Sequence, residues 1–168
     1  MNNLYQKLRA DVISWRQKGY PCSYSVIGTI LNFNKDHFLR QAQFEALESY
    51  WYLRLVKKTP SIFELYKEYF HGKELLKALG IFLSEEDLTD LLLAGGGIDS
   101  IFEKVKSDDI FVKKYRLEAL RETLTLPYPS YILALAMGAG KTILIASIIA
   151  TEFAMALEYR ERDGIFVR

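Results

Sequence analysis

Cysteine and histidine are scarce in this chain of 168 residues. It has one cysteine, Cys22, and two histidines, His37 and His71. A single cysteine cannot form a disulfide within the chain or supply the thiolates of a structural zinc site. The two histidines stand far apart without ligand-like spacing, which favours surface positions. The sequence therefore predicts no disulfide framework and no metal site built on these residues.

A run of residues that could cross a membrane is also lacking. The first fifteen residues, MNNLYQKLRADVISW, have no apolar core of the kind a secretory signal needs. The longest stretch without a charge, residues 123–140, contains Pro127, Pro129 and two glycines, whereas a spanning helix needs roughly 20 mainly apolar residues. We therefore expect no membrane partner and a reduced, cytoplasmic setting.

Positive and negative charges nearly balance over the whole chain but not within each of its segments. Residues 1–60 carry nine basic and four acidic side chains, residues 61–126 carry nine and thirteen, and residues 127–168 carry four of each. The basic surplus of the first segment suits nucleic acid, but solvated helix faces explain it equally well. Because half of the residues are hydrophobic and 26% are charged, the chain is expected to be globular with a sizeable core.

Helical patterns dominate up to residue 126. Leu4, Leu8, Val12 and Trp15 recur at helical spacing, residues 41–58 read as a long amphipathic helix, and residues 108–124 read as another. Ser61 begins a further helix with a capping-box pattern, residues 84–87 begin another, and the glycines at 95–97 form a flexible joint. We expect an N-terminal helical region over residues 1–59 and a helical insertion or module over residues 60–126.

The remaining residues, 127–168, have a different pattern. The six apolar residues YILALA, 131–136, predict a buried parallel strand, and MGAG, 137–140, predicts a tight turn. A helix is expected from Lys141, followed by the start of a second strand in IFVR, 165–168. This order is a βαβ unit. The expected fold class is therefore mainly α upstream, then the start of an α/β P-loop (recA-like) lobe with a truncated parallel sheet.

The glycine turn is the strongest candidate site. In the segment Met137, Gly138, Ala139 and Gly140, the glycines let backbone N–H groups approach a polyphosphate, and the following helix adds a partial positive charge. Lys141 can reach the β- and γ-phosphates, and the Thr142 hydroxyl can bind Mg²⁺. The strict pattern begins with glycine, where this chain has Leu135, but GAGKT is intact. The sequence predicts ATP and Mg²⁺ as cofactors, with Lys141 and Thr142 as catalytic groups; a helix start that happens to read GKT is the alternative.

The segment LAMGAGKT resembles motif I of superfamily 2 helicases and translocases, most closely the helicase subunit of type III restriction enzymes. The resemblance implies an ATP-dependent helicase or translocase that acts on double-stranded DNA, with a modification or specificity subunit as a further partner. It also implies an upstream Arg-x-x-Gln that reads adenine. The segment RQAQFEAL supplies Arg40 and Gln43 in that pattern, and a glutamine amide can both donate to and accept from adenine.

The spacing departs from the family pattern. Gln43 precedes Lys141 by 98 residues, whereas the family places the glutamine a few tens of residues upstream. Arg116, in YRLEAL, lies at the usual distance but is not a glutamine. Either residues 60–112 are an inserted helical module, or Arg116 takes the place of the adenine-reading glutamine and adenine reading is lost.

The resemblance leaves the hydrolytic machinery incomplete. The Asp-Glu box that supplies a second Mg²⁺ ligand and the arginines of a second motor lobe do not follow within these 168 residues. We therefore expect this chain alone to be inactive as an ATPase. The alternative function is a non-enzymatic helical module that binds a partner or DNA and keeps a structural remnant of the P-loop.

Overall fold

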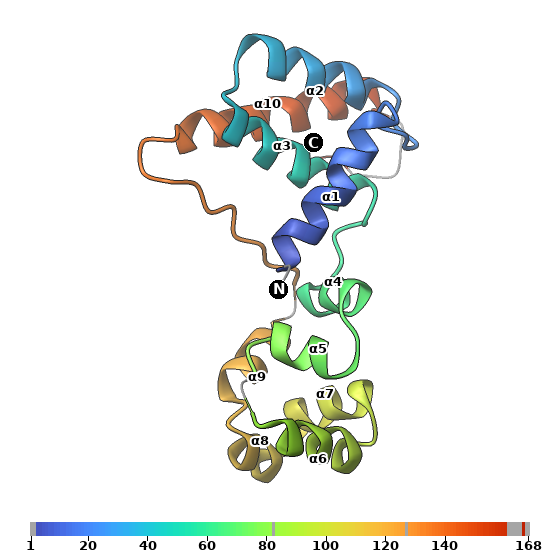
Figure 1. The fold of residues 1–168 in the computed structure, drawn as a ribbon. Coiled ribbons are helices and arrows are strands. Elements are labelled where there is room, and N and C mark those ends of the chain that lie inside the picture. The colour runs from blue at the N-terminus through green and yellow to red at the C-terminus, as the bar shows by residue number, and fades with distance from the viewer. Residues whose placement is uncertain (1–2, 82, 127, 161–165, 167–168) are drawn as a thin grey trace. The chain divides into compact units, whose positions relative to one another are not determined.

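The computed structural model describes residues 3–81, 83–126, 128–160 and 166. Within these ranges the chain forms ten α-helices and no β-strand (Figure 1). The helices are α1 (Leu4–Gln17), α2 (Val26–His37), α3 (Gln41–Leu55), α4 (Ile62–Tyr69), α5 (Gly72–Ala78), α6 (Glu85–Gly95), α7 (Ile98–Ser107), α8 (Asp109–Tyr115), α9 (Glu118–Leu124) and α10 (Lys141–Glu158).

The expected α/β lobe with a parallel sheet is wrong for the part of the chain that the structure describes. Residues 131–136 lead into α10 without forming a strand, and Ile132 within them is exposed. A strand exists only through hydrogen bonds to a neighbouring strand. The second strand expected at residues 165–168 falls outside the described residues, apart from Phe166.

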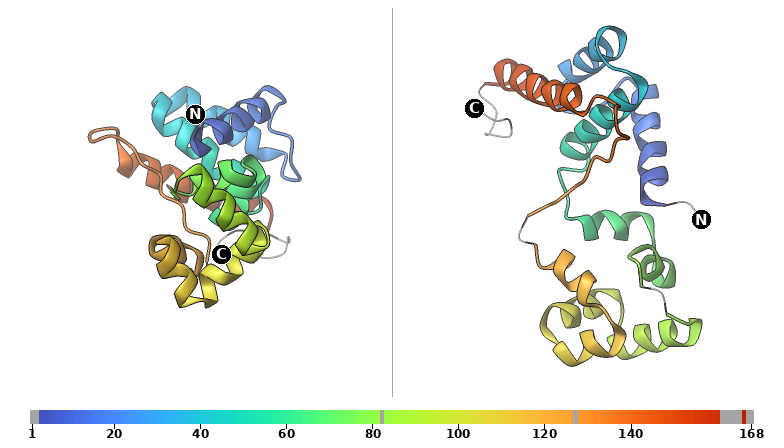
Figure 2. Two further views of the ribbon diagram at one scale, coloured as in Figure 1. Left: turned by 60° about the horizontal axis from the view of Figure 1, so that its bottom comes forward. Right: turned by 90° about the vertical axis from the view of Figure 1, so that its left-hand side faces the viewer.

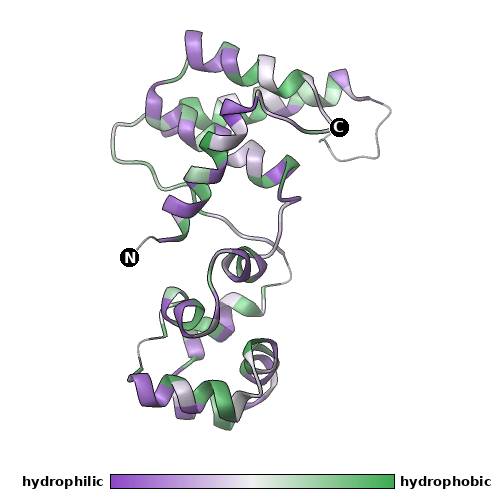
Figure 3. Cartoon of the chain, turned by 45° about the vertical axis from the view of Figure 1, so that its right-hand side comes forward, coloured by the Kyte–Doolittle hydropathy of each residue, from purple (hydrophilic) through white to green (hydrophobic). Residues whose placement is uncertain are grey.

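The chain divides into two compact units. One, the α4–α9 unit, comprises residues 60–131 together with the N-terminal residues up to Lys7, which lies in the first turn of α1. The other comprises residues 8–59 and the chain from Ile132 onward, and we name it the P-loop unit after the motif predicted at residues 137–142. Two further views of the ribbon show the short helices of the first and the longer helices of the second (Figure 2). Each unit is built from helices that carry hydrophobic and hydrophilic residues side by side (Figure 3).

Serine caps begin two helices of the α4–α9 unit. Ser61 Oγ accepts a hydrogen bond from Glu64 N at 3.2 Å, and Ser84 Oγ accepts one from Asp87 N at 3.0 Å. Both bonds satisfy a backbone donor that has no partner within the helix, so these two predicted starts are confirmed. The core of this unit contains the buried residues Leu76, Ile81, Leu88, Leu91, Ile101, Phe102, Val105, Phe111, Val112, Tyr115, Leu117 and Leu120.

The single helix expected over residues 108–124 is wrong, because the structure has two. Helix α8 ends at Arg116, which adopts the left-handed conformation with φ 54°, and α9 begins at Glu118. Tyr115 and Leu117 are both buried. On one straight helix their side chains would point roughly 200° apart. The break at Arg116 lets both side chains reach the same core.

The P-loop unit is centred on α3. The helical spacing predicts one apolar face of α3 with Phe44, Leu47, Trp51 and Leu55. The first three are buried, whereas Leu55 is half-buried. Helix α10 packs on α3 and α2, and Trp51 Nε1 donates to Thr151 Oγ1 of α10 at 3.0 Å. Glu152, the next residue of α10, pairs with Arg54 of α3 at 2.5 Å. Among the described helices, α10 included, none has the length and apolarity needed to cross a membrane.

Candidate functional site: the glycine loop before α10

The candidate site is the loop of residues 137–140, which leads directly into α10. Gly138 and Gly140 have φ values of 77° and 76°, in the left-handed region that only glycine adopts at little cost. Ala139 N donates to Ala136 O at 3.2 Å and closes the turn. The predicted tight glycine turn and the helix that starts at Lys141 are therefore both present.

The first turn of α10 offers free donors and positive charge. Gly140 O accepts the first helical bonds from Ile143 N and Leu144 N, at 3.1 and 3.2 Å. The amides of Lys141 and Thr142 precede these and belong to the helix positions that lack an intrahelical acceptor. Within the described first turn there is no acidic side chain. The positive end of the helix dipole is therefore not neutralised there, which favours an anion.

Lys141 lies over the loop. Its side chain is exposed, and Lys141 Nζ donates to Ala136 O at 3.4 Å, so the ammonium group folds back across the glycine turn. Thr142 and Met137 are exposed as well. These three predicted residues therefore border one solvent-accessible loop, which a polyphosphate could reach.

Gln43 of α3 binds the loop through its side-chain amide. Its Nε2 donates to Ala139 O at 2.9 Å and to Gly140 O at 3.1 Å, while its Oε1 accepts from Arg40 N at 2.8 Å. The side chain is buried. A Cβ atom added at Gly140 would come closer than 3.0 Å to Gln43 Nε2. Gly140 is therefore required by its φ and by this close approach.

The structure thus brings the two predicted motifs together, although they lie far apart in sequence. Gln43 of α3 contacts Ala139 and Gly140 directly, and Arg40 stands exposed just before α3. Arg116, the other candidate for the adenine-reading position, lies in the α4–α9 unit at the end of α8. Adenine reading by Gln43 stays a prediction. Both amide hydrogens of Gln43 bond loop carbonyls, so the residue positions the loop whatever its further role.

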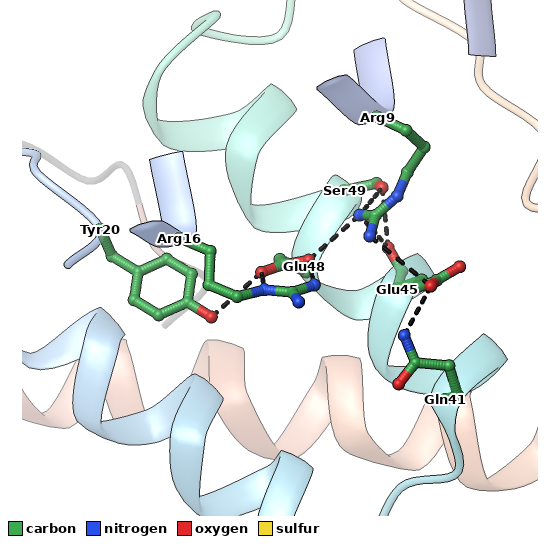
Figure 4. Close-up of polar contacts among 7 residues, drawn as sticks. All are labelled: Arg9, Arg16, Tyr20, Gln41, Glu45, Glu48 and Ser49. Carbon is green, nitrogen blue, oxygen red and sulfur yellow. Dashed lines mark hydrogen bonds and ion pairs between the residues drawn. The ribbon is translucent and has the colours of Figure 1, made fainter. Parts of the chain in front are cut away.

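A buried ionic cluster is centred on Glu48 of α3, and the sequence analysis did not predict it (Figure 4). Glu48 is fully buried and accepts hydrogen bonds from Arg9 at 3.0 Å, from Arg16 at 2.5 and 2.6 Å, and from Tyr20 at 3.0 Å. Burial raises the pKa of the Tyr20 hydroxyl, and the Glu48 carboxylate raises it further. The hydrogen bond to Glu48 raises the pKa of Arg16. One feature of the sequence could have indicated this cluster. Arg9 and Arg16 are seven residues apart and therefore lie on one face of α1.

Replacing Gln43 with alanine tests its role at the loop. The substitution removes two hydrogen bonds to loop carbonyls, so the loop loses its link to α3. We expect the affinity for ATP and for GTP to fall equally, each about tenfold, since lost hydrogen bonds of this kind cost about 1–2 kcal/mol. Titration with each nucleotide in the presence of Mg²⁺ measures the effect.

The matched control is Gln41→Ala on the same helix, because the exposed Gln41 side chain donates its amide to the Glu45 carboxylate one turn along α3. It should leave both affinities unchanged. A loss confined to ATP would contradict the positioning role and favour adenine reading by Gln43.

Comparisons of the chain with models of protein families, with curated proteins and with solved structures found no match. The function is therefore inferred from the loop, from α10 and from the residues that contact them.

Proposed function

We propose that the chain binds the triphosphate of ATP at residues 137–142, as the nucleotide-binding part of an ATP-dependent DNA helicase or translocase of the restriction type. The observation that supports this most is the loop with two left-handed glycines, which leads into a helix start that has no acidic side chain and has Lys141 folded over it. The likeness of LAMGAGKT to motif I and the basic surplus of residues 1–60 support the wider assignment.

The described residues fit a bound Mg²⁺–triphosphate. Open space surrounds Gly138, where an added Cβ would meet nothing within 4 Å, so phosphate oxygens can approach the backbone. The ammonium group of Lys141 would leave Ala136 O for the β- and γ-phosphates, and the Thr142 hydroxyl would face the Mg²⁺ ion. These two side chains supply only part of the charge neutralisation that phosphoryl transfer requires. Binding is therefore the activity to test first.

Lys141→Ala is expected to weaken the binding of Mg²⁺–ATP by at least tenfold, because it removes the ammonium group that bonds Ala136 O directly before the loop. A charge-assisted contact contributes about 1.5–3 kcal/mol. A fluorescent ATP analogue, displaced by unlabelled ATP, measures the change.

Lys35→Ala on α2 removes another exposed lysine and serves as the control, with no change in affinity expected. Both variants should keep the helical circular dichroism of the parent chain. Equal affinity in the parent and in Lys141→Ala would end the P-loop interpretation.

The second candidate function is a helical module that binds another protein without using ATP. One observation favours it: a long face of α10 is apolar and exposed, including Ile145 and Phe153. The absence of measurable nucleotide binding by the parent chain would favour this function over the first.

A further inference from the structure

Helix α10 presents a ridge of large apolar side chains to solvent. Ile145, Ile149, Phe153 and Leu157 follow one another at four-residue intervals and are 57%, 51%, 54% and 60% exposed. Residues at this spacing lie above one another on one helix face. We call these four residues the α10 ridge. Burial of such a row against another surface is strongly favourable, at about 25 cal/mol per Å² of apolar area.

A groove of complementary shape runs beside the ridge. Ala146, Ala150 and Ala154 each follow a ridge residue by one position, and their small side chains line one wall of the groove. The other wall belongs to α2. The groove measures about 750 Å³ and is lined by Thr29, Ile30, Phe33, Asn34, Phe38, Ile143, Ala146, Ser147, Ala150, Thr151 and Ala154. Its lining is mainly apolar, and all of it belongs to the P-loop unit.

We propose that a second copy of this chain occupies the groove, so that two α10 helices pack antiparallel and each α10 ridge enters the groove of the other copy. A pairing centred between Ile149 and Ala150 sets Phe153 opposite Ala146 of the partner subunit. It also sets Ile145 opposite Ala154 of the partner subunit. Ile145, Ile149 and Phe153 then each lie opposite an alanine, which is the geometry of ridges packed into grooves. Because ridge and groove lie on the same surface, that surface is complementary to itself, as a two-fold dimer requires.

The charges on α10 favour the antiparallel direction. Lys141 is its first residue and Glu158 its last, and Glu152 is buried and paired with Arg54. Antiparallel packing turns the Lys141 end of each helix toward the Glu158 end of the other, and it opposes the two helix dipoles. Parallel packing would bring like charges together at both ends. The second copy therefore matches the surface in shape and in charge.

The exposed area is large enough for a stable dimer. Phe33 and Phe38, on the α2 wall, are 54% and 63% exposed. With roughly 200 Å² for each large side chain, these two residues and the α10 ridge offer roughly 700 Å² on each copy. Two copies would bury roughly 1,400 Å², within the range of about 1,200–2,000 Å² typical of specific interfaces.

Ile149→Asp tests the proposal, because it places a charge at the centre of the predicted interface. Sedimentation equilibrium of the parent chain should give a dimer, and the variant should be a monomer at the same concentrations. The matched control is Ile110→Asp on α8, another exposed isoleucine in the α4–α9 unit, which should remain a dimer. Helical circular dichroism should be unchanged in both variants. A monomeric parent chain, or a dimer that survives Ile149→Asp, would overturn the proposal.

Disulfide cross-linking tests the direction of packing. In a Cys22→Ser background, which removes the only native thiol, chains carrying Phe153→Cys are mixed with chains carrying Ala146→Cys. Antiparallel packing predicts that mixed disulfide dimers form well above the statistical share. Disulfides formed mainly between identical chains would contradict it. The proposal does not rest on nucleotide binding, since Ile149 lies two turns beyond the glycine loop, and the outcome of one test leaves the other open.

Discussion

Replacing Glu48 with alanine is expected to lower the free energy of unfolding of the P-loop unit by about 3–5 kcal/mol. The carboxylate is fully buried and bonds Arg9, Arg16 and Tyr20. Its removal leaves the buried Arg9 guanidinium with only the longer contact to Glu45 as an ion pair, and the partly exposed Arg16 guanidinium loses both of its bonds to Glu48. Because a domain is typically stable by about 5–15 kcal/mol, the loss is a large share of the total. Urea unfolding followed by tryptophan fluorescence measures it, since both tryptophans, Trp15 and Trp51, belong to this unit.

Glu45→Ala is the matched control. Glu45 lies one turn away on α3 and also pairs with Arg9, but at 3.8 Å and with a partly exposed side chain. Ion pairs of this kind contribute about 0–1 kcal/mol, so the control should be nearly as stable as the parent chain. An equal loss in the two variants would mean that the buried cluster contributes no more than a surface pair.

Replacing Trp51 with alanine is expected to destabilise the P-loop unit by about 3–5 kcal/mol, the range for removing a large aromatic side chain from a core. Trp51 is fully buried in α3 and links α3 to Thr151 of α10. The substitution leaves a cavity where the two helices meet and removes the hydrogen bond to Thr151 Oγ1, whose own proton still bonds Ser147 O of α10. Urea unfolding followed by circular dichroism, with Trp15 fluorescence as a second probe, measures the change.

Two further variants separate the cavity from the hydrogen bond. Trp51→Phe keeps most of the ring but loses the N–H group, and Thr151→Val removes the acceptor. A hydrogen bond of this kind contributes about 1 kcal/mol, so the cost of the double variant should fall short of the sum of the single costs by about that amount. Full additivity would show that the bond contributes nothing.

Local patterns predicted the helices and their caps where neighbouring residues determine them. The spacing of Phe44, Leu47 and Trp51 gave the buried face of α3, and the serine caps at Ser61 and Ser84 depend on a residue three positions away. The prediction of a strand over residues 131–136 was wrong because an apolar run supplies neither a covering surface nor a hydrogen-bonding neighbour, and none of these six residues is buried. The prediction of one helix over residues 108–124 was wrong because the break at Arg116 depends on the position of the core, which the local sequence does not give.

The sequence predicted the glycine turn and the helix start of the candidate site but not the tertiary contacts that hold the loop in place. GAGKT gave the glycine turn, the helix start and the exposed Lys141. The hydrogen bonds from Gln43 to Ala139 and Gly140 come from the packing of α3 on α10, which no local pattern encodes. The Glu48 cluster joins side chains from α1, α3 and the turn at Tyr20, so it too depends on tertiary structure.

The division of the P-loop unit between two distant segments affects how the chain can fold during its synthesis. Residues 8–59 leave the ribosome first, but the bonds from Trp51 to Thr151 and from Arg54 to Glu152 can form only when α10 follows, after residues 60–131. At about 5–20 residues per second, this intervening segment takes about 4–15 s to make. The α4–α9 unit has its own core and can fold in that interval. The nascent α3 meanwhile has an uncovered apolar face, so it is the segment on which a chaperone would act before translation reaches α10.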